Sequence, residues 1–298
     1  MREICCLTRR NMKLFFKDKG MFFSSLITPV ILLVLYSTFL SGIYRDSFES
    51  SLPAGFSVDR ALINATVGGQ LISSLLAVSC VTVAFCSNLL MIQDKTSGAI
   101  RDFTVSPVRR PALAIAYFAA SALVTLIVNF TALAVSLIYL AATGWYLSVG
   151  DVFLLLLDVL LLTLFGTALS SCVNFPLSTS GQASAVGTIV SAGYGFICGA
   201  YMPISSFSTG LRRALSFLPG TYGTSLLRNH ALAGVYREME KIGFPAQAIS
   251  GIKTSIDCSI SFFGHSVGIG AMYLVLGLSV LLFLGIYVAL NRFCSAKK

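Results

Sequence analysis

Few side chains in this sequence have the type and spacing that catalysis requires. The two histidines, His230 and His265, lie far apart and have no companions in a H-E-x-x-H or C-x-x-C pattern, which argues against a zinc peptidase. The sequence contains no G-x-x-x-x-G-K-[ST] motif and no Gly-Lys dipeptide, so the phosphate cradle of a P-loop is missing. We therefore expect a chain that is not an enzyme and that binds neither a metal nor a cofactor.

The cysteines also lack the spacing of a reactive or metal-binding group, because they form no C-x-x-C pair. Half of them lie within long apolar stretches, and we expect reduced thiols that pack as small hydrophobic side chains. The eight positions are 5, 6, 80, 86, 172, 198, 258 and 294.

One carboxylate stands out because it lies inside an apolar stretch. Asp158 falls within residues 151–175, and a charge at the centre of a bilayer costs about 2.5–3.5 kcal/mol on insertion scales, less near the interface. A proton-coupled transport site would offset this cost. Protonation, contact with water or contact with a partner helix would offset it equally well, and the sequence leaves these interpretations open.

The rest of the chain is suited to a lipid environment. Of its 298 residues, 56% are hydrophobic and 11% are charged, whereas about 25% are charged in an average soluble domain. The net charge of +9 could suggest nucleic acid, but Lys and Arg gather in short segments between apolar runs, which is how membrane topology is encoded. We expect a single membrane domain and no nucleic-acid partner.

Six apolar stretches are long enough to cross a bilayer as helices. A helix rises about 1.5 Å per residue and the hydrocarbon core is about 30 Å thick, so a span needs about 20 residues. Backbone groups in lipid must be hydrogen-bonded within their own segment, which favours helices. The sequence predicts an all-α membrane protein with six transmembrane helices at about 22–42, 67–91, 112–142, 151–175, 183–202 and 266–290.

The distribution of Lys and Arg predicts the orientation of these spans. Thirteen of the 21 lie in segments 1–21, 92–111 and 292–298, on the side of both termini. Of the other eight, six fall in 203–265, which is too long to count heavily in the positive-inside rule. We expect both termini in the cytoplasm.

Residues 1–20 predict an amphipathic helix in the plane of the membrane surface. At about 100° per residue, the basic side chains Arg9, Arg10, Lys13 and Lys17 share one side of this helix and the apolar residues share the other. Such a helix places its apolar half in the acyl boundary and its cations near anionic headgroups. The alternative is a solvated topology signal.

The segment 93–110, between the second and third spans, is longer than a plain connection requires. It has a helix-sized stretch, then Ser106-Pro107 and Arg109-Arg110, before Pro111 opens the next helix. An amphipathic helix at the membrane surface can insert into a groove on a soluble partner. We expect partner contacts at Gly98, Arg101, Asp102, Phe103, Ser106, Pro107, Arg109 and Arg110.

The first part of the segment 203–265 is too apolar for an exposed loop, and it is too interrupted to form a helix that spans the membrane. Pro203 and Pro219 bound its first part, which predicts short helices that enter the outer leaflet part-way and are covered by the bundle. The remainder, about 230–262, is expected to form an exposed outer segment with a weak helical pattern.

Two spans carry residues suited to a translocation path. Span two has a moderately polar wall, and span five has small residues at four-residue spacing, which lets another helix approach closely. The candidates are Gln70, Ser73, Ser74, Thr82, Ser191 and Gly195. Ordinary packing within one subunit is the alternative.

The order of these features resembles the permease subunits of type 2 ATP-binding cassette exporters. A basic helix precedes the first span, and Gly98 precedes the Ser106-Pro107-Val108-Arg109-Arg110 run. The segment from Pro203 to Arg228, with Pro219 and Tyr222, is similar to that family's re-entrant region before the last span. The family carries glutamates before this glycine, where the chain has Asp94 and Thr96.

The resemblance implies a half-transporter in a bacterial plasma membrane. Two such permeases, identical or paralogous, would pair, and each would dock a separate ATPase subunit through residues 93–107 and the N-terminal helix. That ATPase would bind ATP and magnesium, and the assembly would export a hydrophobic or amphipathic compound, such as a drug, a peptide antibiotic or a lipid-like molecule. Membrane lipid would surround it.

Two other classes of protein remain open. An ion-coupled secondary transporter would predict paired intramembrane acids or inverted repeats, and the sequence offers only Asp158. A non-transporting membrane assembly factor would leave the polar wall of span two unexplained.

Overall fold

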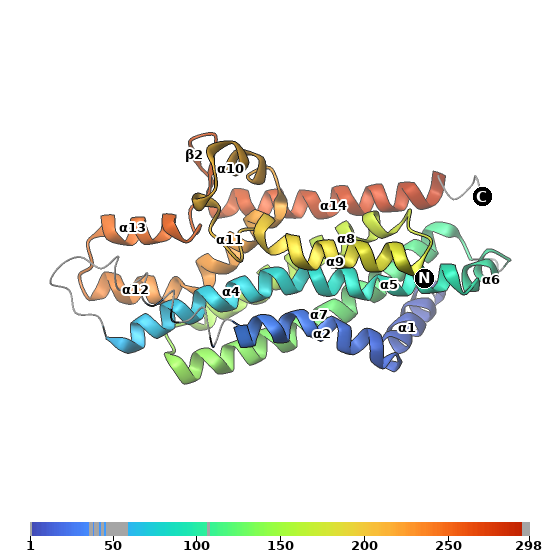
Figure 1. Ribbon diagram of the computed structural model, residues 1–298, viewed down its shortest axis with the longest axis horizontal. Coiled ribbons are helices and arrows are strands. Elements are labelled where there is room, and N and C mark those ends of the chain that lie inside the picture. The colour runs from blue at the N-terminus through green and yellow to red at the C-terminus, as the bar shows by residue number, and fades with distance from the viewer. Residues whose placement is uncertain are drawn as a thin grey trace.

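The computed structural model describes residues 2–35, 38, 42, 45, 59–105 and 108–293. They form an elongated bundle of helices (Figure 1). The helices along the bundle axis are α2 (Lys19–Leu35), α4 (Arg60–Ser87), α7 (Arg110–Thr143), α8 (Val149–Asn174), α9 (Ser180–Ile197) and α14 (Ile269–Phe293). The helices α1 (Arg2–Lys17), α5 (Leu89–Thr96) and α6 (Ala99–Val105) lie at one end, called here the α6 end. The N-terminal helix and the end of α14 both lie there.

Four helices are long and apolar enough to cross a membrane: Arg60–Thr96, Arg110–Thr143, Val149–Asn174 and Ile269–Arg292. They confirm an all-α membrane fold and correspond to the second, third, fourth and sixth predicted spans. The first predicted span is described as a helix only to Leu35, which leaves it shorter than the four. The fifth is α9, which is long enough at 18 residues but less apolar than the four.

The second span is longer than the sequence predicted. Expected at 67–91, it begins at Arg60, after Asp59 accepts a hydrogen bond from the Ala61 amide as an N-cap. Beyond a turn at Asn88 it continues as α5 to Thr96, so the start of the predicted loop 93–110 is helical. At about 1.5 Å per residue, these 37 residues make a rod of about 55 Å.

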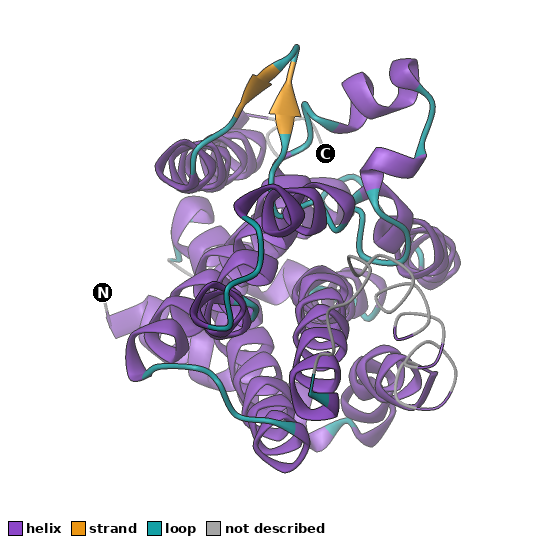
Figure 2. Cartoon of the chain, turned by 90° about the vertical axis from the view of Figure 1, so that its left-hand side faces the viewer, coloured by secondary structure: helices purple, strands orange, loops and turns teal. Residues whose placement is uncertain are grey.

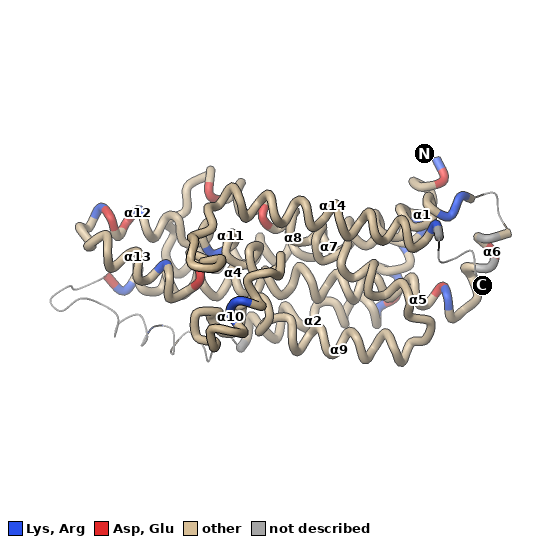
Figure 3. Tube along the Cα trace, turned by 90° about the horizontal axis from the view of Figure 1, so that it is seen from above, with Lys and Arg blue, Asp and Glu red and all other residues tan. Residues whose placement is uncertain are grey.

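Helix α4 lies at the centre of the main hydrophobic core and contacts α2, α7, α8, α9 and α11 (Pro219–Ala231). Lys, Arg, Asp and Glu gather mainly toward the two ends of the bundle, with few between them (Figure 3). This separation matches an apolar middle that lies in lipid and polar ends that lie in water.

The segment after α9 folds at the opposite end, called here the α12 end, and differs in part from expectation. Short helices do follow Pro203, namely η2 (Ile204–Ser206), α10 (Thr209–Leu215) and α11, which begins at Pro219 and is buried against α4, α8 and α14. The segment 230–262, expected to be exposed and weakly helical, has both exposed and buried residues. The helices α12 (Ala233–Lys241) and α13 (Ala246–Ser255) are regular, and Tyr236, Met239 and Ile252 join the main core. Their apolar residues share one face, which the bundle covers.

A two-stranded hairpin, β1 (Ser261–Phe262) and β2 (His265–Ser266), completes the described elements. Figure 2 looks along the bundle from the α12 end, and the hairpin projects from its upper side there. Helix α10 projects from the same side in Figure 1.

Candidate functional site

At the α6 end, the carboxylate of Asp94 joins three helices. Its Oδ2 lies 2.5 Å from Nη1 of Arg10 on α1, and its Oδ1 lies 3.1 Å from Nη2, which makes a bidentate ion pair. The hydroxyl of Tyr117 on α7 donates a hydrogen bond to Oδ2 at 2.5 Å. The bond to Asp94 raises the pKa of Arg10. The pair therefore ties α1 to α5.

Helix α6 turns away from α5 at Gly98, whose φ of +82° favours glycine. The ring of Phe103 lies 5.2 Å from the Arg10 guanidinium, so α6 rests on the same ion pair. Of the predicted partner contacts, Asp102, Arg109 and Arg110 are exposed. Ser106, Pro107 and the side chain of Arg101 lie outside the described part of the chain.

Helix α1 is exposed along one side and packs against α7 along the other, and its place in the plane of the membrane surface stays a prediction. Arg9, Lys13 and Lys17 are exposed, whereas Arg10 is held by Asp94. Helix α7 covers part of the other face, while Phe16 on that face stays exposed. Thr8, Asn11 and Phe15 are buried there.

The predicted polar wall of span two lies inside the subunit. Gln70, Ser73, Ser74 and Thr82 are all buried on α4. The hydroxyls of Ser73 and Thr82 donate to carbonyls of their own helix, at 2.8 and 3.0 Å. Packing within one subunit accounts for this burial, and a role in a translocation path stays a prediction.

The two candidates on span five have different surroundings. Ser191 is half-buried on α9. Gly195 packs under the ring of Tyr201, where a Cβ would lie 2.2 Å from the nearest ring carbon. The close approach that this glycine permits is thus made by the chain's own Tyr201.

Two buried amides that the sequence did not single out for the site link α4, α7 and α8. Asn129 accepts from Ser79 at 2.7 Å and donates to Thr163 at 3.2 Å. Asn88 accepts from Ser121 at 3.0 Å and donates to Ser171 at 3.2 Å. Hydrogen bonds between membrane helices contribute about 0.6–2 kcal/mol each. The signal available in the sequence was an amide within or at the end of an apolar stretch.

Nearer the α12 end, Arg228 on α11 is 1% exposed. Its guanidinium donates to the Gly199 carbonyl at 2.5 Å, to the Ile256 carbonyl at 2.9 Å and to Ser74 at 3.3 Å. It also lies 3.5 Å from Asp257. Arg228 thereby joins α4 and α11 to the turns after α9 and α13.

Asp257 completes this connection. Its carboxylate accepts from the amides of Ile204 and Ser205, at 2.5 and 3.3 Å, and so fixes η2 beside α13. Burial raises the pKa of Asp257, and Arg228 and these amides offset part of that rise. The re-entrant candidates lie next to it: Pro203 precedes η2, Pro219 begins α11, and the Tyr222 hydroxyl donates to the Ser216 carbonyl at 2.6 Å.

Asp158 is not a lone acid. It is 1% exposed on α8, and its Oδ2 lies 2.6 Å from Nδ1 of His230 on α11. The hydroxyl of Tyr273 on α14 donates to Oδ1 at 2.5 Å, and its ring stacks on the imidazole with centroids 6.2 Å apart. His230 is thus a buried histidine whose partner is a carboxylate on another helix. Sequence reasoning missed the pair because 72 residues separate its members.

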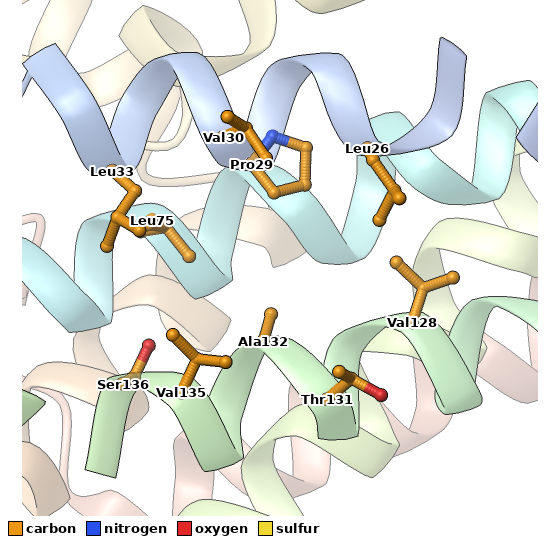
Figure 4. Close-up of a pocket in the computed structure, with 10 residues that line it drawn as sticks. All are labelled: Leu26, Pro29, Val30, Leu33, Leu75, Val128, Thr131, Ala132, Val135 and Ser136. Carbon is orange, nitrogen blue, oxygen red and sulfur yellow. The ribbon is translucent and has the colours of Figure 1, made fainter. Parts of the chain in front are cut away.

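Two apolar cavities lie between the long helices. One of about 340 Å³ is bounded by α4, α8, α9, α11 and α14. The other, of about 150 Å³, lies between α2 and α7 beside Leu75 of α4 (Figure 4). Pro29 and Leu33 form one wall, and Thr131 and Ser136 add hydroxyls to the other. The Ser136 hydroxyl is buried and, among the described residues, has no hydrogen-bond partner.

Comparison with known proteins decides the family. A family model described as ABC-2 type transporter matches residues 2–231. The chain belongs to the ABC-2 transporter family. No curated protein matches it. As a member of this family with four apolar helices of spanning length, it is a multi-pass membrane protein.

The ABC-2 match runs from α1 to the end of α11. It therefore includes the Arg10–Asp94 pair, Arg228 and His230. Asp257 and Tyr273, which complete the two buried clusters, lie beyond it.

One pattern in this ABC-2 chain has the form of a hydrolase nucleophile, Gly264-His265-Ser266-Val267-Gly268. Ser266 lies on the exposed hairpin, in a strand of two residues. Within the described ranges, no hydrogen bond joins it to a histidine or a carboxylate, and no group of three metal-ligating side chains is present. The geometry does not support a catalytic serine.

Proposed function

We propose that this chain is the transmembrane subunit of an ATP-driven exporter, with ATP hydrolysed by a separate subunit, and that it moves a hydrophobic or amphipathic compound out of the cytoplasm or the inner leaflet. The observation that carries the proposal is the rod Arg60–Thr96. Asp94 near one end binds Arg10, and Ser74 farther along binds Arg228.

This rod links two regions that an exporter must couple. An ATPase docked on α6 and α1 would move Asp94 together with Arg10, because their ion pair is bidentate. Since α5 continues α4 with only a turn at Asn88, displacement at one end reaches Ser74. There it changes the contact with Arg228 and hence the position of α11.

The arrangement also supports the finer topology. In the proposal, α2 and α9 complete six spans, both termini lie in the cytoplasm of a bacterial cell at its plasma membrane, and α11 is re-entrant from the outer side. Thirteen of the 21 Lys and Arg residues lie on the side of the termini, which supports this orientation. A second permease, identical or paralogous, would complete the path.

The cavity in Figure 4 supports an amphipathic cargo. Its walls are apolar, and they include Ser136, whose hydroxyl has no partner in the part of the chain that the structure describes and could bind one polar atom of a ligand. It lies between α2 and α7, so a compound could enter it from the lipid.

The test is co-purification of the full chain, expressed with the ATPase subunit encoded beside it, followed by ATPase assays in lipid vesicles. We expect the two to purify together and candidate amphipathic compounds to stimulate ATP hydrolysis. Failure to capture the ATPase from gentle detergent extracts, together with basal ATPase rates that the chain does not change, would overturn the proposal.

The Asp158–His230 pair favours one other function, transport coupled to a proton gradient. A buried carboxylate next to an imidazole can hold or release a proton. Uptake assays in ATP-free vesicles distinguish the two functions. Transport driven by a pH gradient alone supports proton coupling, and transport that requires ATP and the ATPase supports the exporter.

A further inference from the structure

The cavity of about 340 Å³ has the character of a site for a lipid chain. It runs between α9 and α14, and its walls are almost entirely carbon, from residues such as Phe165, Leu169, Ile189 and Phe283. A space of this kind loses packing contacts when it is empty, so it favours an apolar ligand over water. We call it the lipid groove.

One polar atom breaks this apolar surface. Tyr194 lines the lipid groove and is 8% exposed, and its hydroxyl has no hydrogen-bond partner among the residues that the structure describes. A buried hydroxyl without a partner is costly. A ligand with a polar atom beside an acyl chain, such as an ester carbonyl, would satisfy it.

A basic and aromatic surface adjoins the lipid groove at the α12 end. Leu218 lines the groove, and the residues just before it are the exposed Phe217, Arg213 and Arg212. Phe217 packs edge-on against two phenylalanines of the hairpin turn, Phe262 and Phe263, with ring centroids 5.1 and 5.9 Å away. Together with α10 and the hairpin, these residues project from the side of the bundle (Figures 1 and 2).

The positive charges of this surface indicate an anionic partner. The Arg213 guanidinium lies 5.8 Å from the Phe263 ring centroid, and no carboxylate of the described residues forms a salt bridge with Arg212 or Arg213. Basic side chains beside exposed aromatic rings are typical of a site at the membrane surface that attracts anionic headgroups.

A small polar pocket beneath Arg212 adds hydroxyl groups. It measures about 50 Å³ and is lined by Arg212 with Ser216, Thr254, Ser259 and Ser261, among others. Asp257 also borders it, but its carboxylate already accepts from Ile204 and Ser205 and lies beside Arg228. The hydroxyls of Ser216 and Thr254 already donate to the carbonyls of Arg213 and Ser250, at 2.7 and 2.9 Å. The guanidinium of Arg212 and the hydroxyls of Ser259 and Ser261 are therefore the suitable donors to phosphate oxygens.

We propose that this chain binds one anionic phospholipid from the leaflet at the α12 end, with an acyl chain in the lipid groove and the phosphate at Arg212 and Arg213. That leaflet is the outer one if the orientation under Proposed function is right. The lipid site itself goes beyond the exporter assignment, and its test contains no ATPase, so the two can fail separately.

The test uses the full chain with one tryptophan placed at the site. Trp145 is the only native tryptophan, so the double substitution Trp145→Phe with Phe217→Trp gives a reporter beside the groove. The protein is reconstituted in phosphatidylcholine vesicles that contain increasing fractions of phosphatidylglycerol or phosphatidylcholine brominated on the acyl chains, and fluorescence quenching is measured. We expect half-maximal quenching at a roughly tenfold lower mole fraction of the brominated phosphatidylglycerol.

Two variants locate the headgroup and the chain separately. Arg212→Gln with Arg213→Gln should abolish the preference for phosphatidylglycerol. Gly193→Leu should fill the lipid groove and weaken quenching by both lipids, because Gly193 lines the groove and a Cβ there meets nothing within 4 Å. Gly187→Leu is the matched control, since it lies on the same helix, is equally uncrowded and does not line the groove.

Three results would overturn the proposal. Equal quenching by both lipids that Gly193→Leu does not change would indicate ordinary contact with surrounding lipid. Quenching by aqueous iodide but not by brominated lipid would place the surface in water. Protection from both quenchers would indicate that a second protein copy covers it.

Discussion

Nδ1 of His230 lies 2.6 Å from the carboxylate of Asp158, and the Tyr273 hydroxyl binds the other carboxylate oxygen. Three helices, α8, α11 and α14, therefore meet at one buried acid. Arg228, on the same helix as His230, is bound to Asp257. Helix α11 is thus held at two points by carboxylates from different parts of the chain.

The first prediction concerns Asp158, the carboxylate that binds His230 of α11. Asp158→Asn keeps the shape of the side chain but replaces one carboxylate oxygen with an amide group, so we expect the free energy of unfolding to fall by about 1–3 kcal/mol through loss of one buried hydrogen bond, to His230 or Tyr273. Thermal unfolding of the purified chain measures this, with the exposed Asp102→Asn as control. If Asp158→Asn abolished transport without changing thermal stability, the cluster would act in transport rather than in packing.

The second prediction concerns the pair at the α6 end. In a double-mutant cycle of Arg10→Ala and Asp94→Asn, we expect a coupling energy of about 1–3 kcal/mol, because the pair is bidentate and Asp94 is only 7% exposed. Lys13→Ala, an exposed cation on the same helix, should show no coupling to Asp94→Asn. Thermal unfolding of the four variants provides the measurement, and a coupling near zero would show that the pair does not hold α1.

The third prediction uses the labelling rate of Cys258 to test the contact between Arg228 and Asp257. Burial raises the pKa of Cys258 to about 11. Because the thiolate is the reactive form, labelling by maleimide at pH 7 should be slow in the folded chain and should increase as the pH rises toward that value. The exposed Cys5 should label quickly in the same detergent sample.

Arg228→Gln should then speed Cys258 labelling. The substitution leaves Asp257 buried without its cation, and breaking a buried ion pair costs about 3–5 kcal/mol. Mass spectrometry of the peptide that contains Cys258 gives the rate. An unchanged rate in Arg228→Gln would mean that this pair does not hold the α12 end closed.

The fourth prediction contrasts two glycines in neighbouring helices. At Gly234 on α12, a Cβ would lie 2.0 Å from the Tyr146 carbonyl oxygen, whereas at Gly251 on α13 it meets nothing within 4 Å. Gly234→Ala should destabilise by about 1–3 kcal/mol through overpacking, and Gly251→Ala should stabilise by up to about 1 kcal/mol. Limited proteolysis and thermal unfolding test both. Equal effects would contradict the close packing of α12 on the turn before α8.

The fifth prediction tests the proposed docking of an ATPase on α6. Gly98→Pro, Asp102→Arg, or reversal of the charge at Arg101 should uncouple ATP hydrolysis from export while leaving membrane insertion intact, because these residues belong to α6 and its turn. Glu240→Arg, exposed at the opposite end, is the control. ATPase and export rates of the reconstituted complex are the measurement, and normal export in all three variants would refute the docking assignment.

Much of the architecture could be predicted from the sequence because it depends on local properties. Long apolar stretches with few charges predicted the four long helices, although the second begins seven residues earlier than expected. The prolines and breaks after Pro203 predicted the short helices. Gly98, the basic residues of α1 and the order of spans were sufficient to suggest the family. Hydrophobicity, proline and glycine act over a few residues, so one sequence contains their effects.

Which buried polar groups meet was decided only by the tertiary structure. No local feature of the sequence identifies His230 as the partner of Asp158, or Asp257 as the partner of Arg228. The sequence also does not show that α7 packs against α1 or that residues of α12 join the main core. Such pairings depend on how helices far apart in the chain pack side by side. The sequence determines that buried charges need partners, whereas the packing of the bundle determines which partners they find.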